Sequence, residues 1–526
     1  MADISETLRA GVEHHRAGRL TEAEEMYRRV LLIHPRHAGA VHLLGLIAFQ
    51  LGKHDVAVEY LTAAIKVDAF HAPFSADLGE IYRAMGKIPE AIASYQQSIR
   101  LNPEVADAQN NLGTLFETSG QLQEATACFR EALLLNPRYG EAYGNLGNVL
   151  ESQGQFPLAQ AALEKAVELA PDNAKAYVGL GKCLSVEGNW ERALDCYQQA
   201  TRLHPDLADA HYHAAQARLA LGDFVEGWRD FEWRLRCPAP GRRTFPLPAW
   251  NGAELHGHRV LVHAEQGLGD TLQFIRYVPL MVERGGTAIL DVPRQLLPLL
   301  EQSGFENLIR EGELPPACHL QAPLLSLPRL LGTTLETIPA ASAYLSAKPR
   351  LVAQWGQKLS EVSGFKVGIA WQGDPDSAHD RFRSIPLSEF EPLAALPGVR
   401  LISLQKKDGL DQLVAASERF EMVNFADAFD EAEGAFMDTA AIMANLDLVV
   451  TSDTAAAHLA GALGVPVWVA LSTAANWRWM QDRLDSPWYP TMRLFRQVKE
   501  RGWAGVFQVI AAELAALVEM RSTGSS

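Results

Sequence analysis

Small and apolar residues recur with a period of 34 positions through the first 236 residues of this chain. The most regular ladder is glycine, formed by Gly18, Gly52, Gly86, Gly120, Gly154, Gly188 and Gly222. Three further ladders share the period: glycine from Gly11 to Gly181, alanine from Ala23 to Ala193, and proline from Pro35 to Pro205 with Ala69 replacing one proline. Self-similarity at this spacing predicts one helical hairpin per unit, stacked into a right-handed solenoid over residues 1–236.

Each ladder has a mechanical reason. The Gly18 series is expected to end the first helix of each unit, where a left-handed backbone costs little only for glycine. The Gly11 and Ala23 series are small because the two helices of a hairpin cross there. The Pro35 series cannot continue the second helix and therefore stops it. The large apolar residues at Tyr27, Leu61, Tyr95, Phe129, Leu163 and Tyr197 are expected to fill the space between units.

These four ladders in one register resemble the tetratricopeptide repeat. Asn111 and Asn145 occupy equivalent positions on the first helices of neighbouring units. In the similar array of the O-linked N-acetylglucosamine transferase, an asparagine ladder clamps the backbone of a bound peptide. The resemblance implies a peptide or protein partner for the repeats, and polar helix surface is the alternative. The equivalent places elsewhere are held by Arg9, Leu43, Asp77, Gly179 and His213, which break the ladder.

The seventh unit keeps Gly222 but loses its closing proline. Trp228, Phe231 and Trp233 crowd its second helix, as expected of a terminal repeat that buries against a following domain. Residues 237–256, rich in proline, glycine and arginine, are expected to form a docked linker.

From Arg259 the pattern changes to short apolar runs alternating with amphipathic helices, which is typical of parallel α/β units. The predicted strands are 259–264, 287–292, 365–371, 399–405, 446–452 and 465–471. The expected fold is therefore an α solenoid followed by two Rossmann-like lobes, 257–350 and 364–500, with a helix at 501–520. Residues 305–360 form a less regular stretch.

The composition of the chain disfavours some classes of partner and site. The net charge of -16 disfavours nucleic acid. The five cysteines lack the spacing of a disulfide framework or zinc site, and no apolar run is as long as the roughly 18 residues of a membrane span. The amino terminus lies inside the first repeat and leaves no room for a secretory signal. A cytoplasmic protein that does not span a membrane is expected.

Ligands of open α/β sheets bind at the carboxyl ends of the strands. After the first predicted strand come Gly267, Gly269 and Asp270, at the start of a helix whose apolar face carries Phe274, Ile275, Val278, Met281 and Val282. The glycines allow close approach of a ligand, but no third glycine completes a dinucleotide fingerprint. A plain helix cap is the alternative for Asp270.

Two other strand ends carry candidate ligand-binding residues. Gln372 and Arg383 follow strand 365–371, and Lys406 follows strand 399–405; arginine in such a place suits phosphate. Strand 446–452 runs into a turn and a helix of small residues, whose amides favour a phosphate or sugar nucleotide. The residues proposed there are Ser452, Asp453, Thr454 and His458. A histidine inside a helix is more often structural.

Together these segments resemble the heptosyltransferase-type glycosyltransferases of the GT-B fold, through GLGD, the basic residue before Ser384-Ile385-Pro386, and SDTxxxHLAxALGxPV. The resemblance implies that Asp270 is the general base, that Arg383 contacts the diphosphate and that Asp453 holds the donor. Ala455 stands where the family usually has glycine, and Arg383 where it often has lysine. Bacterial proteins that join such a domain to tetratricopeptide repeats form a recognisable group.

The implied function is a metal-independent, inverting glycosyltransferase that uses a nucleotide-sugar as substrate, needs no cofactor and modifies a protein held by the repeats. Two alternatives are sugar transfer to a lipid or polysaccharide acceptor, and a non-catalytic scaffold with a degenerate transferase domain.

Overall fold

The computed structural model describes residues 4–238, 242–377, 380–425, 429–430, 434–498 and 501–523. Contacts between residues divide the chain into two compact units. The first comprises Met1–Cys183 with Arg202–Pro205, and the second comprises Leu184–Thr201 with Asp206–Ser526. The last part of the repeat region therefore belongs to the same unit as the α/β region.

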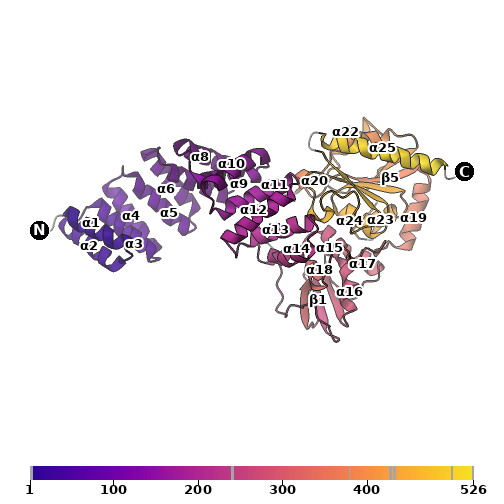
Figure 1. Cartoon of the computed structure of the whole chain (residues 1–526), viewed down its shortest axis with the longest axis horizontal. Coiled ribbons are helices and arrows are strands. Elements are labelled where there is room, and N and C mark those ends of the chain that lie inside the picture. The colour runs from indigo at the N-terminus through magenta and orange to yellow at the C-terminus, as the bar shows by residue number, and fades with distance from the viewer. Residues whose placement is uncertain are drawn as a thin grey trace. The chain divides into compact units, whose positions relative to one another are not determined.

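The repeat region is helical throughout its described residues, and the expected solenoid of hairpins is confirmed. In chain order its helices are α1 (Ile4–Arg16), α2 (Leu20–Ile33), α3 (Ala38–Gln50), α4 (His54–Val67), α5 (Ala72–Ala84), α6 (Ile88–Leu101), α7 (Ala106–Thr118), α8 (Leu122–Leu135), α9 (Gly140–Ser152), α10 (Phe156–Leu169), α11 (Ala174–Val186), α12 (Trp190–Leu203), α13 (Ala208–Ala220) and α14 (Phe224–Phe231). Figure 1 colours them from indigo to magenta.

The glycine series that contains Gly120 and the series that contains Gly113 have different structural roles, as expected. Gly120 follows α7 with φ of 74° and open space around it, so its role is the left-handed turn. Gly113 lies inside α7, where a Cβ would stand 2.6 Å from the Phe129 ring on α8. Phe129 and Ala125 are completely buried. The small residues therefore mark the crossing of the two helices, and the large ones fill the space beside it.

The second unit begins its α/β region with a four-stranded parallel sheet in the order β3-β2-β1-β4. The strands are β1 (Arg259–His263), β2 (Thr287–Val292), β3 (Leu308–Arg310) and β4 (Leu320–Pro323). The helical segments between and after them are α15 (Leu268–Phe274), η2 (Ile275–Tyr277), α16 (Val278–Val282), η3 (Arg294–Leu296), α17 (Leu297–Gln302), η4 (Leu324–Ser326) and α18 (Leu327–Leu330).

A five-stranded parallel sheet follows, in the order β6-β5-β7-β8-β9. Its strands are β5 (Phe365–Ala370), β6 (Val399–Ser403), β7 (Leu448–Ser452), β8 (Val467–Leu471) and β9 (Met492–Arg496). The helical segments around it are α19 (Pro349–Ser360), α20 (Asp380–Arg383), η5 (Leu387–Phe390), α21 (Glu391–Ala394), α22 (Gln412–Ser417), α23 (Met437–Met443), α24 (Ala455–Ala462), η7 (Trp477–Trp479) and α25 (Gly502–Thr523).

The α/β region departs from expectation in three places. Strands β3 and β4 lie in the stretch judged irregular, and β9 was not expected at all. The helix predicted after β1 is interrupted by the 3-10 segment η2. Val282, placed on its apolar face, is 43% exposed, whereas the other four residues of that face are buried. Strand β3 has 3 residues, β4 has 4 and η2 has 3, which are too few for a periodic signal.

Within the described residues, one helix is long and apolar enough to cross a membrane by length and composition, at Gly502–Arg521. Helix α25 packs on the second sheet through Val506, Phe507, Ile510 and Leu514, which are buried with residues of β5 and β6. Figure 1 shows α25 lying close to the part of the sheet labelled β5. A core helix of a soluble protein passes the same length and composition test.

The core of the second unit also contains the end of the repeat region. Trp228 and Phe231 of α14 are almost completely buried. The Trp228 ring contacts Phe274 and Trp477, with ring centres 6.1 Å and 5.4 Å away. The expected burial of the last repeat is thus confirmed for these two residues. Trp233 instead stacks on His211 and is only partly buried.

Candidate functional site

The start of α15, after β1, faces the start of α24, after β7. The two helices pack together, and a Cβ at Gly269 would stand 2.9 Å from the His458 ring. Loops that leave the carboxyl ends of the two sheets therefore meet. Three residues proposed from the sequence, Gly267, Gly269 and Asp270, lie on one side of this meeting point, and His458 lies on the other.

Asp270 is held through both of its carboxylate oxygens. One oxygen pairs with the guanidinium of Arg478. The other accepts the backbone N–H of Gly267 at 3.0 Å, which closes the turn at the start of α15. Asp270 is therefore not the N-cap itself: Gly267 is the N-cap, and the carboxylate of Asp270, at the third helical position, accepts its backbone N–H while also pairing with Arg478.

Arg478 is a site residue that the sequence did not indicate. Its side chain is 7% exposed and belongs to η7, which follows β8. Besides Asp270, it donates from Nε to Gln273 at 2.6 Å and from one terminal nitrogen to Asn476 at 2.9 Å. Arg478 thus connects α15, beside the first sheet, to a loop of the second sheet. Asp270 and Arg478 are 208 residues apart in the chain, so no local pattern could have paired them.

Two polar residues lie where β7 ends, just before the start of α24. Ser452 is completely buried, and within the described structure its hydroxyl has no hydrogen-bond partner. Asp453 is partly exposed, yet the protein around it raises the pKa of its carboxyl above the usual value. Burial is the main cause, and the indole of Trp479 and the charge of Arg383 oppose it. Thr454 precedes the helix without capping it through its side chain.

His458 is fixed inside α24. Its Nδ1 lies 2.9 Å from the Tyr489 hydroxyl, and its ring stacks on Trp479 with centres 5.3 Å apart. Burial, followed by the charges of Arg478 and Arg276, holds the pKa of His458 well below 6.5. The ring is therefore neutral at pH 7, and its packing fits the structural role that a helical histidine more often has.

Arg383 and Gln372 lie near the end of β5. The Arg383 side chain approaches Asp380 at 3.4 Å and the carbonyl of Asp453 at 3.5 Å, so the structure brings it beside the turn after β7. Gln372 instead contacts the β6 side, through its backbone N–H to Gln405 at 3.1 Å and through its side chain to Gln412 at 3.2 Å.

Lys406 points to another part of the chain. It donates to the carbonyl of Phe429 and lies 5.0 Å above the Phe429 ring. These contacts tie the lysine to the segment before α23. They do not connect it with Asp453 or Arg383.

In the first unit, the two proposed peptide-binding asparagines use their amides within the repeats. Asn111 donates to the Tyr95 hydroxyl at 3.3 Å, and Asn145 donates to the side chain of Asn110 at 2.9 Å. Asn110 in turn approaches Glu141 at 3.4 Å. These contacts join consecutive repeats, so a bound chain would have to compete with them or use the remaining acceptor oxygens.

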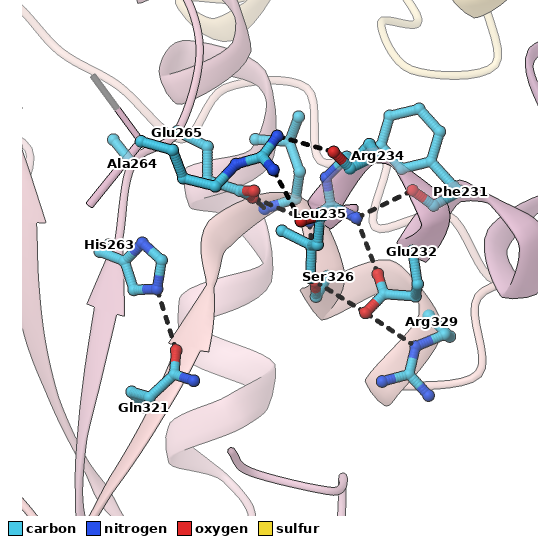
Figure 2. A network of polar contacts seen from close by, with 12 residues as sticks. Phe231, Glu232, Arg234, Leu235, His263, Ala264, Glu265, Gln321, Ser326 and Arg329 are labelled. Carbon is cyan, nitrogen blue, oxygen red and sulfur yellow. Dashed lines mark hydrogen bonds and ion pairs between the residues drawn. The ribbon is translucent and has the colours of Figure 1, made fainter. Parts of the chain in front are cut away.

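A second buried arginine holds the other end of the loop that carries Asp270. Arg234 of η1 (Glu232–Leu235) is 3% exposed and donates to Glu265 and to Ser326, each at 2.8 Å. It also pairs with Glu232 at 2.8 Å. Figure 2 shows the closed arrangement, in which Glu232 reaches on to Ser326 and Arg329. The residues come from the last repeat, from the loop after β1, from η4 and from α18.

Among the described residues, no group of three or more His, Cys, Asp or Glu side chains could hold a metal ion. The charged groups of the site are carboxylates paired with arginines. Such an arrangement can bind anionic groups and can accept a proton.

Comparisons with known proteins identify the repeats. Family models described as tetratricopeptide repeat match residues 8–72, 104–172 and 150–219, and one described as TPR repeat matches residues 79–120. Protein FlbA of Caulobacter vibrioides is 29% identical over 321 residues, or 56% of this chain. The match covers 53% of FlbA, so the chain spans about half the length of this relative.

Solved structures match part of this chain. YrrB, described as a TPR protein with an unusual peptide-binding site, is 21% identical and covers 35% of this chain and 95% of its own, with a TM-score of 0.31. PilF of Pseudomonas aeruginosa is 19% identical over 40% of this chain and 96% of its own, with a TM-score of 0.38. The matched family models establish that the chain carries tetratricopeptide repeats between residues 8 and 219.

Proposed function

We propose that this protein is a metal-independent, inverting glycosyltransferase of the GT-B type that moves a sugar from a nucleotide-sugar to an acceptor held by its repeats. The observation that carries the proposal is the meeting of α15 with α24 at the carboxyl ends of two parallel sheets. In this reading residues 257–350 and 364–500 are the two lobes, and the nucleotide-sugar binds between them. A protein acceptor follows from the tetratricopeptide repeats, which generally bind protein partners.

The donor side of the proposed site lies on the second sheet. The start of α24 presents backbone N–H groups and the positive end of the helix dipole. Ser452 adds a buried hydroxyl without a partner in the described structure, and Arg383 adds a cation beside Asp453. As the bond from the anomeric carbon to the diphosphate breaks, its electron pair leaves on the phosphate oxygen. Fixed donors there stabilise the transition state more than the ground state.

The acceptor side lies on the first sheet. The acceptor oxygen attacks the anomeric carbon while its proton passes to Asp270, the proposed base. A carboxylate has about four acceptor positions, and Arg478 and the Gly267 N–H use two of them. The remaining lone pairs can take the proton. General base catalysis of this kind contributes about 10²–10⁴-fold to the rate.

The test incubates the purified chain with labelled UDP-, GDP- and ADP-sugars and cell lysate, and separates protein from lipid. We expect label in protein with one donor class. Asp270→Asn should reduce the rate at least about 10²-fold without weakening nucleotide binding, while Asp376→Asn in an exposed loop should leave it unchanged. Label only in lipid would favour the lipid-acceptor alternative. No label with any donor would favour the non-catalytic scaffold.

A further inference from the structure

Two side chains of the last repeat reach the segment from Glu265 to Asp270, which comprises the turn after β1 and the first three residues of α15 and is called the loop 265–270 below. Arg234 donates to Glu265 at the beginning of this loop. Tyr212 of α13 packs on Phe231 of the last repeat, with ring centres 5.6 Å apart, and its hydroxyl lies near Gln266 and near the charged groups of Asp270 and Arg478. The last repeat therefore contacts the loop at two adjacent residues.

The Arg234 contacts fix the position of Glu265 in space. One oxygen of Glu265 accepts from Arg234 at 2.8 Å and from the backbone N–H of Leu325 at 3.3 Å. The same arginine nitrogen donates to Ser326 at 2.8 Å. The carboxylate is thereby tied at once to the last repeat and to the segment after β4, as Figure 2 allows the reader to follow.

A contribution to the stability of the fold does not by itself explain why these charged residues are buried together. A buried ion pair loses hydration, and well-packed apolar residues in its place are often as stable or more stable. Arg234 is 3% exposed, and its Nε has no hydrogen-bond partner in the described structure. What the network provides is a fixed orientation: one guanidinium joins two carboxylates and a hydroxyl from three separate segments.

The other end of the loop is held in the same manner. Arg478 pairs with Asp270 from the side of the second sheet. The six-residue loop is thus clamped by one buried arginine at each end, and Gly267 and Gly269 between them leave its backbone little steric restraint of its own.

We infer that Arg234 and Tyr212 are positioning residues for the loop 265–270, so that the last tetratricopeptide hairpin forms part of the transfer site. The inference rests on the proposed function for its catalytic consequence, but not for its structural one. A shift of about 1 Å in a reacting group can lower a rate about 10²-fold. The loop position should therefore control kcat more than nucleotide binding.

The experiment uses the full chain and three variants. Arg234→Lys keeps the charge but cannot bridge Glu232, Glu265 and Ser326 together. Tyr212→Phe removes one hydroxyl. Arg329→Ala is the matched control, because Arg329 contacts Glu232 at the outer end of the same network and is 41% exposed. Hydrogen–deuterium exchange of the peptide covering the loop is measured for each, with tryptophan fluorescence as the check of folding.

We expect loop exchange to rise about tenfold in Arg234→Lys and a few-fold in Tyr212→Phe, and to stay unchanged in Arg329→Ala. With the nucleotide-sugar that supports transfer, kcat should fall ten- to a hundredfold in Arg234→Lys, while KM for that donor changes less than about twofold.

Unchanged loop exchange in folded Arg234→Lys would overturn the inference, and so would equal increases in Arg234→Lys and Arg329→Ala. If Arg234→Lys does not fold, Tyr212→Phe decides, and unchanged exchange in that variant refutes the inference. If the unaltered chain transfers no sugar at all, the proposed function fails, while the exchange measurements still decide whether the last repeat positions the loop.

Discussion

The neutral ring of His458 makes stability depend on pH. Burial lowers the pKa of His458 in the folded chain well below 6.5, so below pH 6.5 the unfolded chain binds a proton that the folded chain does not. Stability is therefore full above pH 6.5 and falls as the pH drops, by up to about 1.4 kcal/mol per pH unit. His458→Gln should show a correspondingly shallower fall in urea unfolding between pH 7 and about 5. Parallel pH profiles for the two proteins would contradict this.

Site residues that belong to a local sequence motif could be proposed from the sequence, but the distant residues that pair with them could not. The glycines and Asp270 were recognisable because a turn and a helix start occupy four neighbouring positions. Arg478 pairs with a residue 208 positions away, and Arg234 with one 31 positions away. In the sequence, each is an arginine next to a tryptophan, with nothing local that marks it as a site residue. Lys406 donates to the carbonyl of Phe429, a contact that the sequence could not indicate because a strand end does not determine where a long flexible side chain points.

At the scale of elements, α25 should behave as a core helix of the second sheet. Phe507 is completely buried and packs on Phe390, with ring centres 4.5 Å apart. Phe507→Ala should lower the free energy of unfolding by about 3–5 kcal/mol. Val509, on the same helix, is 49% exposed, and Val509→Ala should change it by less than about 0.5 kcal/mol. Equal small effects in denaturant titrations would show that α25 does not cover the sheet.

Helices and strands with a long or repeated sequence pattern could be predicted from the sequence, whereas the shortest strands could not. Fixed spacing predicted the hairpins because each glycine and proline has one mechanical task. Six strands were found from their apolar runs, but β3 spans only Leu308–Arg310 and β4 only Leu320–Pro323. Strand β3 is defined by its pairing with β2, and β4 by its pairing with β1. These partners lie elsewhere in the sequence, so no local pattern reveals the short strands.

At the scale of the whole molecule, the boundary between folding units need not coincide with the boundary between repeats and α/β region. The sequence predicts that the repeats end and a linker begins at residues 237–256. The contacts between residues instead group Leu184–Thr201 with Asp206–Ser526 in one unit. The apolar core explains the difference. It contains Trp228 and Phe231 of the last repeat together with Trp477 and Trp488 of the segment between β8 and β9.

Two fragments of the chain distinguish these boundaries. Fragment 172–526 keeps α11 whole, and it should unfold at the same denaturant concentration as the second unit of the full chain. Fragment 257–526 lacks Trp228 and exposes the rings of Phe274 and Trp477 that Trp228 covers, so it should aggregate or unfold earlier. All 11 tryptophans lie at or after Trp190, and their fluorescence therefore follows the second unit without interference from the first. If fragment 257–526 is monomeric and unfolds at the same denaturant concentration as the longer one, the last repeat is dispensable for this fold, and the folding unit begins after Trp228 rather than before it.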